Sequence, residues 1–323
     1  MVKKKLKIGI LFGGKSAEHD VSLVSSKNVI SALDKNKYQI FPIKINRDGK
    51  FDLNSLKKVD VIFPVLHGPF GEDGSMQGLL KILNLPFVGP SVLGSAVSMD
   101  KDVMKRIFKE AGIPIGKFVT IKQKEKISFK DLEKKLGLPI FIKPANMGSS
   151  VGIHKVNNEK EFLAGVKDAF NYDSKVVLEE FIEGQEIECS VLGNENPEAS
   201  IPGEIVPIND FYSYKAKYLD DKAADLLIPA RLSKDIVKKV QNIAVKVFEV
   251  LCCEGMGRVD FFVKKDGKIF VNEINTIPGF TSISMYPKLW EASGLPLARL
   301  LDRLIDLAVE RFKREQKLKT TVK

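Results

Sequence analysis

The chain has 323 residues, of which 28% are charged and 44% hydrophobic, and its formal net charge is +10. This length predicts two or three domains, and the composition excludes fibrous and disordered classes. No apolar run approaches the roughly 20 residues of a membrane helix. The apolar stretch after the basic start is short and ends in Gly13-Gly14, so it predicts a first strand rather than a signal peptide.

The cysteines and the location of the positive charge indicate the cellular compartment and the kinds of partner. Cys189, Cys252 and Cys253 form an odd count with an adjacent pair, which favours a reducing, cytoplasmic compartment over a disulfide framework. Most of the net positive charge comes from residues 3–7 and 312–323. Because no basic stripe interleaved with aromatics is present, we expect no nucleic-acid partner and no membrane partner.

The order of the predicted elements divides the chain into three domains, at 1–98, 99–184 and 185–323. In the first, strand and helix patterns alternate, which predicts a parallel α/β sheet. Its expected elements are strands at 6–12, 38–45, 59–66 and 85–90 and helices at 20–33 and 74–83. The second is an α+β unit, with helices at 100–111 and 158–169 and strands at 139–142, 151–156 and 175–180. In the third we expect helices at 233–251 and 295–314 and strands at 257–264 and 268–274.

A predicted hairpin around Asp266-Gly267 carries the first candidate site. A two-residue turn there places Asp260 opposite Glu273 and Arg258 opposite Asn275, all on one face. Opposed carboxylates destabilise a sheet unless a cation lies between them, and these oxygen ligands suit Mg²⁺. An exposed face with ordinary surface charges is the alternative, but it explains this convergence poorly.

A second candidate site lies in the segment from Lys143 to Gly152, between two predicted strands. Its glycines let backbone amides approach an anion, Ser149 adds a hydroxyl, and Lys143 adds a charge suited to phosphate. Neither a Walker P-loop nor a Rossmann fingerprint is present. Taken alone, a simple Gly/Ser turn fits this segment equally well, and the adjacent metal site favours phosphate binding.

Weaker signals come from several other segments. The segment 177–186 joins two strands, and such an edge suits adenine and ribose. Glu18 begins a helix and is placed to hold an ammonium group, or it is only a helix-start acid. His67 follows a strand, and a structural role fits it as well as a functional one. The polar segment 209–224 contains four aromatics and is long for a connector, which predicts a lid.

Together these segments resemble the D-alanine–D-alanine ligases of the ATP-grasp superfamily over essentially the whole chain. The matching motifs are residues 14–22, 67–74, 143–152, 217–218, 257–260 and 272–282. The resemblance implies a three-domain ATP-grasp architecture, a homodimer, and ATP held between the second and third domains. It also implies that one D-alanine is phosphorylated to an acyl phosphate and attacked by the amine of a second, to make D-alanyl-D-alanine for peptidoglycan.

The same resemblance implies residue roles. The implied catalytic group is Glu18, Ser149, Tyr218, Arg258 and Gly279, and the implied substrate contacts are Glu18, His67, Arg258, Gly279, Ser284 and Met285. Asp260, Glu273 and Asn275 are expected to hold two Mg²⁺ ions, with Mn²⁺ as a substitute. The implied ATP contacts are Lys101, Lys143, Glu179, Phe181, Ile182, Glu186, Lys217, Phe262 and Asn272.

Two other functions compete with this one. A depsipeptide-forming ATP-grasp ligase that uses D-lactate is the nearer alternative, and the Lys217-Tyr218 pair with the first-domain loops favours dipeptide formation over it. A catalytically inert nucleotide-binding module is the other alternative. The complete set of predicted metal ligands, together with Arg258, argues against it.

Overall fold

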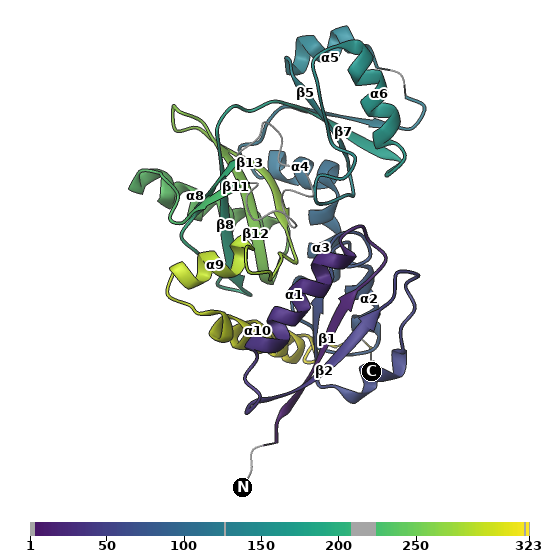
Figure 1. Ribbon diagram of the computed structural model, residues 1–323, viewed down its shortest axis with the longest axis vertical. Coiled ribbons are helices and arrows are strands. Elements are labelled where there is room, and N and C mark those ends of the chain that lie inside the picture. Colours follow the sequence, from purple (N-terminus) through teal and green to yellow (C-terminus); the bar gives the residue numbers. More distant parts are fainter. Residues whose placement is uncertain (1–3, 126, 208–223, 320, 323) are drawn as a thin grey trace.

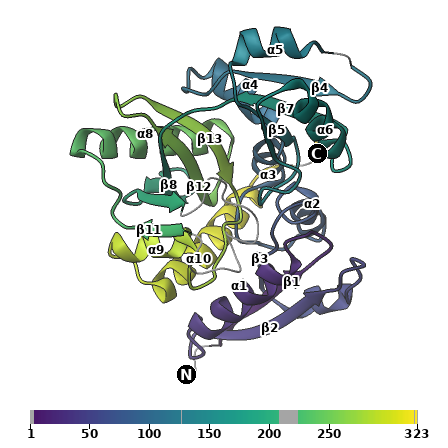
Figure 2. The ribbon, with the colours of Figure 1, turned by 45° about the horizontal axis from the view of Figure 1, so that its top comes forward.

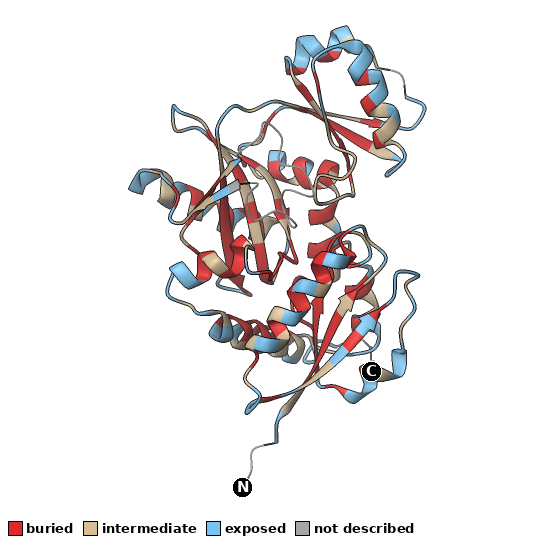
Figure 3. Cartoon of the chain, viewed as in Figure 1, coloured by how far each residue is buried: buried red, intermediate tan, exposed pale blue. Residues whose placement is uncertain are grey.

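The computed structural model describes residues 4–125, 127–207, 224–319 and 321–322. In Figures 1 and 2 the described chain forms three lobes, each built around one sheet. Figure 3 shows buried residues concentrated along the sheets and on the helix faces turned towards them. The mixed α/β class with a parallel N-terminal sheet, as predicted, is confirmed.

The first sheet is parallel and has the strand order β2-β1-β3. Its elements are β1 (Leu6–Gly13), α1 (His19–Ala32), β2 (Tyr38–Ile45), the 3-10 helix η1 (Leu53–Lys58), β3 (Val61–Val65) and α2 (Ser75–Ile82). Every residue of β3 is buried, as expected for a parallel strand covered on both faces. Instead of the predicted strand at 85–90, only a single bridge joins Phe87 to Ile62.

Two loops of this lobe leave the same edge of the sheet. β1 and β3 are parallel neighbours, so the loops that follow them both begin at the carboxyl ends of strands. The loop after β1 leads to Glu18, and the loop after β3 contains His67 and Glu72. Parallel topology therefore brings the two first-domain motifs together.

The second sheet is antiparallel, with the order β4-β7-β5-β6. Its elements are β4 (Phe118–Lys122), α5 (Phe129–Leu136), β5 (Ile140–Pro144), β6 (His154–Val156), α6 (Glu159–Ala169) and β7 (Lys175–Glu180). The sequence patterns did not predict β4 and α5. The core of this lobe is formed by residues of the sheet together with Leu132 of α5 and Phe162 of α6.

The third sheet has the order β11-β10-β8-β12-β13, and β9 pairs with β8 at its side. The strands are β8 (Gln185–Gly193), β9 (Glu198–Ala199), β10 (Gly203–Pro207), β11 (Ala224–Leu227), β12 (Gly255–Val263) and β13 (Ile269–Asn275). α8 (Lys234–Val250) covers one face, and its buried Val240, Val247 and Phe248 share a core with Val259 and Phe261 of β12.

The remaining helices join the lobes. They are α3 (Val92–Met99), α4 (Lys101–Glu110), α9 (Met285–Ala292) and α10 (Leu297–Glu315). α3 and α9 were not predicted. Leu300 and Leu304 of α10 share a core with Ile8 and Phe63 of the first sheet, although α10 lies in the third predicted domain.

α4 likewise packs across a predicted boundary. Its Met104 and Phe108 belong to the core of the third sheet, whereas the sequence placed this helix in the second domain. Each sheet nevertheless draws its strands from a single predicted range. The domain boundaries at residues 98 and 184 stay a prediction. Within the described ranges, no helix is both long and apolar enough to span a membrane.

Candidate active site

The hairpin of β12 and β13 carries the candidate metal ligands, and its turn differs from the predicted one. Lys264 donates its N–H to the carbonyl of Lys268 (2.9 Å), which leaves a three-residue loop with Gly267 at φ 82°. Next to the turn, each residue of β12 therefore pairs with a residue of β13 one position earlier than predicted, as in the pair Val263–Ile269. An irregularity between Asp260 and Phe261 restores the predicted register farther along the strands.

That irregularity is a β-bulge at Asn272. Phe261 pairs with Val271 and Asp260 pairs with Glu273, so Asn272 is the extra residue of β13. The burial pattern of β13 agrees with a bulge there, because Asn272 and Glu273 are consecutive half-buried residues in an otherwise alternating strand. Both residues line one cavity, which strict alternation would not allow.

Two adjoining cavities meet beside this hairpin. The larger has a volume of about 350 Å³ and the smaller about 90 Å³. Their shared lining comes from α4, the loop after β5 and the third sheet, and consists of Lys101, Met147, Gly148, Ser149, Glu188, Ile205 and Glu273. A group bound in one cavity is thus adjacent to a group bound in the other.

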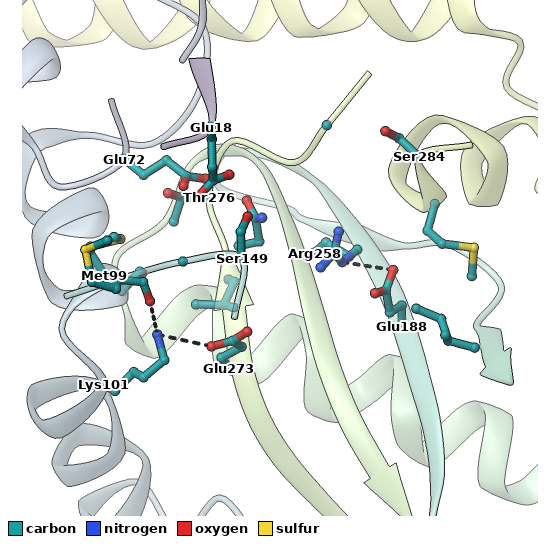
Figure 4. Close-up of a pocket in the computed structure, with 18 of the residues that line it drawn as sticks. Glu18, Glu72, Met99, Lys101, Ser149, Glu188, Arg258, Glu273, Thr276 and Ser284 are labelled. Atoms are coloured by element: carbon teal, nitrogen blue, oxygen red, sulfur yellow. Dashed lines mark hydrogen bonds and ion pairs between the residues drawn. The ribbon is translucent and has the colours of Figure 1, made fainter. Parts of the chain in front are cut away.

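Two predicted metal ligands form ion pairs with neighbouring cations. The Arg258 guanidinium donates from Nε and Nη2 to the two Asp260 oxygens, at 2.7 and 2.8 Å. Lys101 Nζ lies 3.4 Å from Glu273 Oε2, as Figure 4 shows. The same ammonium donates to the carbonyl of Met147 at 2.7 Å. These cations reduce the repulsion between the opposed carboxylates.

A buried charge cluster forms one wall of the larger cavity. Lys143 Nζ donates to Glu179 Oε2 at 2.9 Å and to Asn272 Oδ1 at 3.1 Å. Lys105, which the sequence patterns did not single out, lies 3.2 Å from the other Glu179 oxygen. Burial alone would raise the pKa of Glu179, but the charges of Lys105 and Lys143 outweigh it and lower that pKa. Glu179 is therefore an ionised carboxylate.

The two lysines differ in their balance of burial and charge. Burial lowers the pKa of Lys105, and its pairing with Glu179 does not fully compensate. For Lys143, burial is outweighed by the charges of Glu179 and Glu273, so its pKa is raised. We therefore assign Lys143 as a permanent cation of this cavity.

The predicted adenine and ribose contacts line the same cavity. Phe181 stacks on Phe141 with 6.0 Å between ring centroids, and Lys155 Nζ lies 5.0 Å from the Phe181 ring. The other predicted ATP contacts on its lining are Ile182, Glu186, Phe262 and Asn272. Aromatic faces beside carboxylates form a surface suited to a flat heterocycle with an amino group.

The loop after β5 reaches the first lobe. Ser149 and Ser150 have positive φ, at 52° and 60°, which curls the backbone towards Glu18. A Cβ atom added at Gly148 would lie 2.8 Å from Glu18 Oε1, so only glycine fits without displacement. Glu18 and Ser149 both line the smaller cavity, and their predicted roles there stay predictions.

Glu18 has a second carboxylate beside it, to which the sequence patterns assigned no role. Figure 4 shows the side chains of Glu18 and Glu72 next to each other at the end of the smaller cavity. Glu72 accepts from the N–H groups of Gly68 (2.6 Å) and Ile277 (3.1 Å). Burial, together with the charge of Glu18, raises the pKa of Glu72. Both carboxyl groups therefore line the cavity, and protonation of Glu72 is easier than that of an exposed glutamate.

His67 lies behind this site. Nδ1 donates to the Ile277 carbonyl at 2.9 Å, and Nε2 lies 3.3 Å from Ser25 Oγ, which accepts the Phe280 N–H at 3.2 Å. Burial lowers the pKa of His67 to about 4, so the ring is neutral. His67 does not line the smaller cavity. It anchors the loop on either side of Gly279, and direct substrate binding by His67 stays a prediction.

The loop after β13 closes the smaller cavity. Gly279, Ser284 and Met285 all line it, together with Arg258 and Asn275. Ser284 Oγ accepts from the Thr281 N–H at 2.9 Å, and Met285 begins α9. The N–H groups at the start of a helix attract carboxylates. Lys217 and Tyr218, with the predicted lid at 209–224, fall outside the described residues except for Ala224.

Comparison with known proteins identifies the family. The family model "D-ala D-ala ligase C-terminus" matches residues 107–306, and "D-ala D-ala ligase N-terminus" matches residues 7–57 and 50–90. A D-alanine–D-alanine ligase of Oceanobacillus iheyensis is 49% identical, over 98% of this chain and 99% of that protein.

Two solved structures have the same fold. The D-alanine–D-alanine ligase of Bacillus anthracis complexed with ATP has a TM-score of 0.84 and 33% identity, covering 97% of this chain and all of that one. The VanG D-Ala:D-Ser ligase of Enterococcus faecalis has a TM-score of 0.85 and 38% identity, covering 94% of this chain and all of that one. The matches extend across all three lobes, and the chain belongs to the D-alanine–D-alanine ligase family.

Proposed function

We propose that this protein joins two molecules of D-alanine, with conversion of ATP to ADP and phosphate, to supply D-alanyl-D-alanine for peptidoglycan. One observation carries the proposal: the cavity that contains the lysine and adenine-type contacts shares a wall with a small, polar cavity. Lys101, Ser149 and Glu273 belong to both linings. A carboxylate in the small cavity is then adjacent to phosphate groups in the larger one.

The hairpin residues fit a divalent cation. Asp260 and Glu273 are opposed across two strands, and Asn275 adds an amide oxygen in the next row on the same face. Mg²⁺ prefers oxygen ligands of these kinds, and the same ligand set also suits Mn²⁺. Mg²⁺ bound there would neutralise the charge that develops on the phosphates during transfer.

In the first step, the carboxylate of one D-alanine attacks the γ-phosphorus of ATP. The bond to the β-phosphate oxygen breaks, ADP leaves, and an acyl phosphate forms. Lys101 and Lys143 supply positive charge on the phosphate side. Glu18, with Glu72 behind it, holds the substrate ammonium at the far end of the small cavity. The ammonium is thereby kept away from the reacting carboxylate.

In the second step, the amine of another D-alanine attacks the acyl carbon. The tetrahedral oxyanion is stabilised by Arg258 and the Gly279 N–H, after which the carbon–oxygen bond to phosphate breaks and the amine loses a proton. Ser284 and the N–H of Met285 hold the second carboxylate. The sequence predicts that segment 209–224, with Lys217 and Tyr218, serves as a lid that excludes water from the acyl phosphate.

The cellular compartment, the oligomeric state and the roles of the domains belong to the same proposal. It comprises a cytoplasmic homodimer with no nucleic-acid or membrane partner, and ATP held between domains 99–184 and 185–323. The boundary at residue 98 delimits the domain that covers the first D-alanine. The cysteine usage supports the cytoplasmic compartment, and the lining of the larger cavity, which combines residues of both ranges, supports the position of ATP. The homodimer rests on the sequence resemblance.

The identity of the second substrate distinguishes the proposed function from the most similar alternative ligase activities. D-serine is one candidate because the D-Ala:D-Ser ligase VanG is 38% identical to this chain. D-lactate, which would form an ester, is the other. Part of the small cavity's lining is apolar, from Ile205, Leu226, Ile283 and Met285, and such side chains favour a methyl group modestly over a hydroxymethyl group.

The test measures phosphate release and product mass with ATP, Mg²⁺ and D-alanine, in parallel with L-alanine and with mixtures of D-alanine and D-serine or D-lactate. We expect D-alanyl-D-alanine as the main product and no dipeptide from L-alanine. An excess of D-alanyl-D-serine or D-alanyl-D-lactate over D-alanyl-D-alanine would identify D-serine or D-lactate as the second substrate. Tight ATP binding without phosphate release would favour an inert nucleotide-binding module instead.

A further inference from the structure

Three carboxylates form a row across three neighbouring strands. Glu188 on β8 is in register with Asp260 on β12, and Asp260 is in register with Glu273 on β13. Glu188 is 7% exposed and lines both cavities. The sequence patterns did not reveal it, because only the β12–β13 hairpin could be paired from local signals. Such a row is unfavourable unless cations compensate it.

Arg258 provides much of that compensation. Its Nε lies 2.7 Å from Asp260 Oδ1, to which it donates, and 3.0 Å from Glu188 Oε2, so one guanidinium forms ion pairs with two carboxylates. Figure 4 shows Glu188 beneath Arg258, on the wall of the smaller cavity. Both partners are largely buried, with side-chain exposures of 15% for Arg258 and 10% for Glu188.

Asp260 has two competing roles in this arrangement. It binds the guanidinium through both oxygens, and it is also a ligand for the divalent cation in the proposed function. A carboxylate oxygen that coordinates a cation is a weaker acceptor for an arginine. Arg258 therefore needs a second anion if it is to stay beside the smaller cavity.

We propose that Glu188 is a positioning residue that holds Arg258 at the smaller cavity and frees Asp260 for the divalent cation. This inference rests on the proposed function. Without the Glu188 charge, Arg258 binds Asp260 more strongly. The guanidinium then competes with the cation and turns away from the developing oxyanion. Glu188 acts only through Arg258, and this distinguishes it from a third metal ligand.

The experiment is a double-mutant cycle with Mn²⁺ as the probe. Mn²⁺ binding in the presence of ADP is measured by electron paramagnetic resonance, without turnover, for wild type, Glu188→Gln, Arg258→Met and the double variant. Glu204→Gln is the matched control, because Glu204 is a buried glutamate of the neighbouring strand β10 that pairs with Arg231 and lines neither cavity. Urea unfolding checks that each variant folds.

We expect Glu188→Gln to weaken Mn²⁺ binding roughly tenfold and to raise the KM for D-alanine by a similar factor. Glu204→Gln stays within about twofold of wild type. In the Arg258→Met background, the Glu188→Gln effect on Mn²⁺ shrinks to less than about threefold, because the two residues act as one unit. Glu188→Asp keeps the charge but shortens the side chain, so it provides a second variant if Gln does not fold.

Two outcomes overturn the inference. Equal Mn²⁺ weakening with and without Arg258 assigns Glu188 to the cation itself. Mn²⁺ binding and D-alanine KM values that match those of Glu204→Gln remove any positioning role. Failure of the proposed function is separate, since it requires wild-type protein that binds Mn²⁺ and ADP but makes no dipeptide.

Discussion

Asp260 and Glu273 lie directly opposite each other on β12 and β13, although the residue pairs nearer the turn are shifted by one position relative to this pair. The bulge at Asn272 accounts for this shift, because Asn272 is the extra residue of β13. It also turns Asn272 and Glu273 towards the same cavity, so Lys143 and Lys101 each find an oxygen partner on adjacent residues. A β-bulge beside an active site re-aims side chains in this way.

Glu273→Gln is expected to raise the Mg²⁺ concentration needed for half-maximal phosphate release by at least roughly tenfold, since a charged ligand becomes neutral. The free energy of unfolding should change by less than about 1 kcal/mol, because relief of the repulsion from Asp260 offsets the lost contact with Lys101. Phosphate release as a function of Mg²⁺ concentration and urea unfolding measure the two effects. Asp266→Asn, in the exposed turn, is the control. Unchanged Mg²⁺ dependence would remove Glu273 from the metal site.

Gly148→Ala is expected to raise the KM for D-alanine more than the KM for ATP. The new Cβ would lie 2.8 Å from Glu18 Oε1, so either the Glu18 carboxylate or the loop must move. Gly78→Ala, where a Cβ meets no atom within 4 Å, is the matched control and should leave both KM values unchanged. Equal changes in both KM values would point to a general loop distortion instead.

Lys105→Met is expected to raise the KM for ATP roughly tenfold, because Glu179 loses one of its two buried cation partners. The free energy of unfolding should fall by about 1 to 3 kcal/mol for the same reason. Lys109→Met, at an exposed position of the same helix, is the control. An ATP KM equal to that of the control would limit Lys105 to a role in stability.

His67 should make stability depend on pH in the acid range. Its pKa is lowered by burial from the ordinary value of 6.5 to about 4 in the folded protein, so the unfolded chain binds the proton more readily. Stability contributed by neutral His67 is full above pH 6.5 and is lost as pH falls towards 4, to a limit of roughly 3 kcal/mol.

Urea unfolding at several pH values between roughly 7.5 and 5 tests this dependence. His67→Gln should lack the His67 component, so the stability difference between wild type and variant narrows as pH falls. His154→Gln, in which a half-exposed histidine is replaced, is the control. A difference that stays constant across this range would contradict a neutral, buried His67.

Local patterns determined a large part of the site. Alternation along a strand depends on residues two apart, and turn chemistry depends on a few neighbours. The sequence therefore placed Arg258, Asp260, Glu273 and Asn275 on one face, and the structure confirms that pairing. The glycine-bearing loop at 143–152 and the parallel N-terminal sheet were likewise predictable, because loop residues and strand–helix alternation are local signals.

Tertiary structure alone decided the partners of those residues. Glu188 meets Arg258 because β8 is the neighbour of β12, and no local pattern specifies the order of strands in a sheet. Lys105 of α4 pairs with Glu179 of the second sheet, while the apolar side chains of the same helix belong to the core of the third sheet, and no local pattern specifies either contact. Neighbouring charges then decide the pKa of each buried carboxylate. Burial raises the pKa of both Glu179 and Glu72, but the two lysines beside Glu179 lower its pKa overall, whereas the charge of Glu18 raises that of Glu72 further.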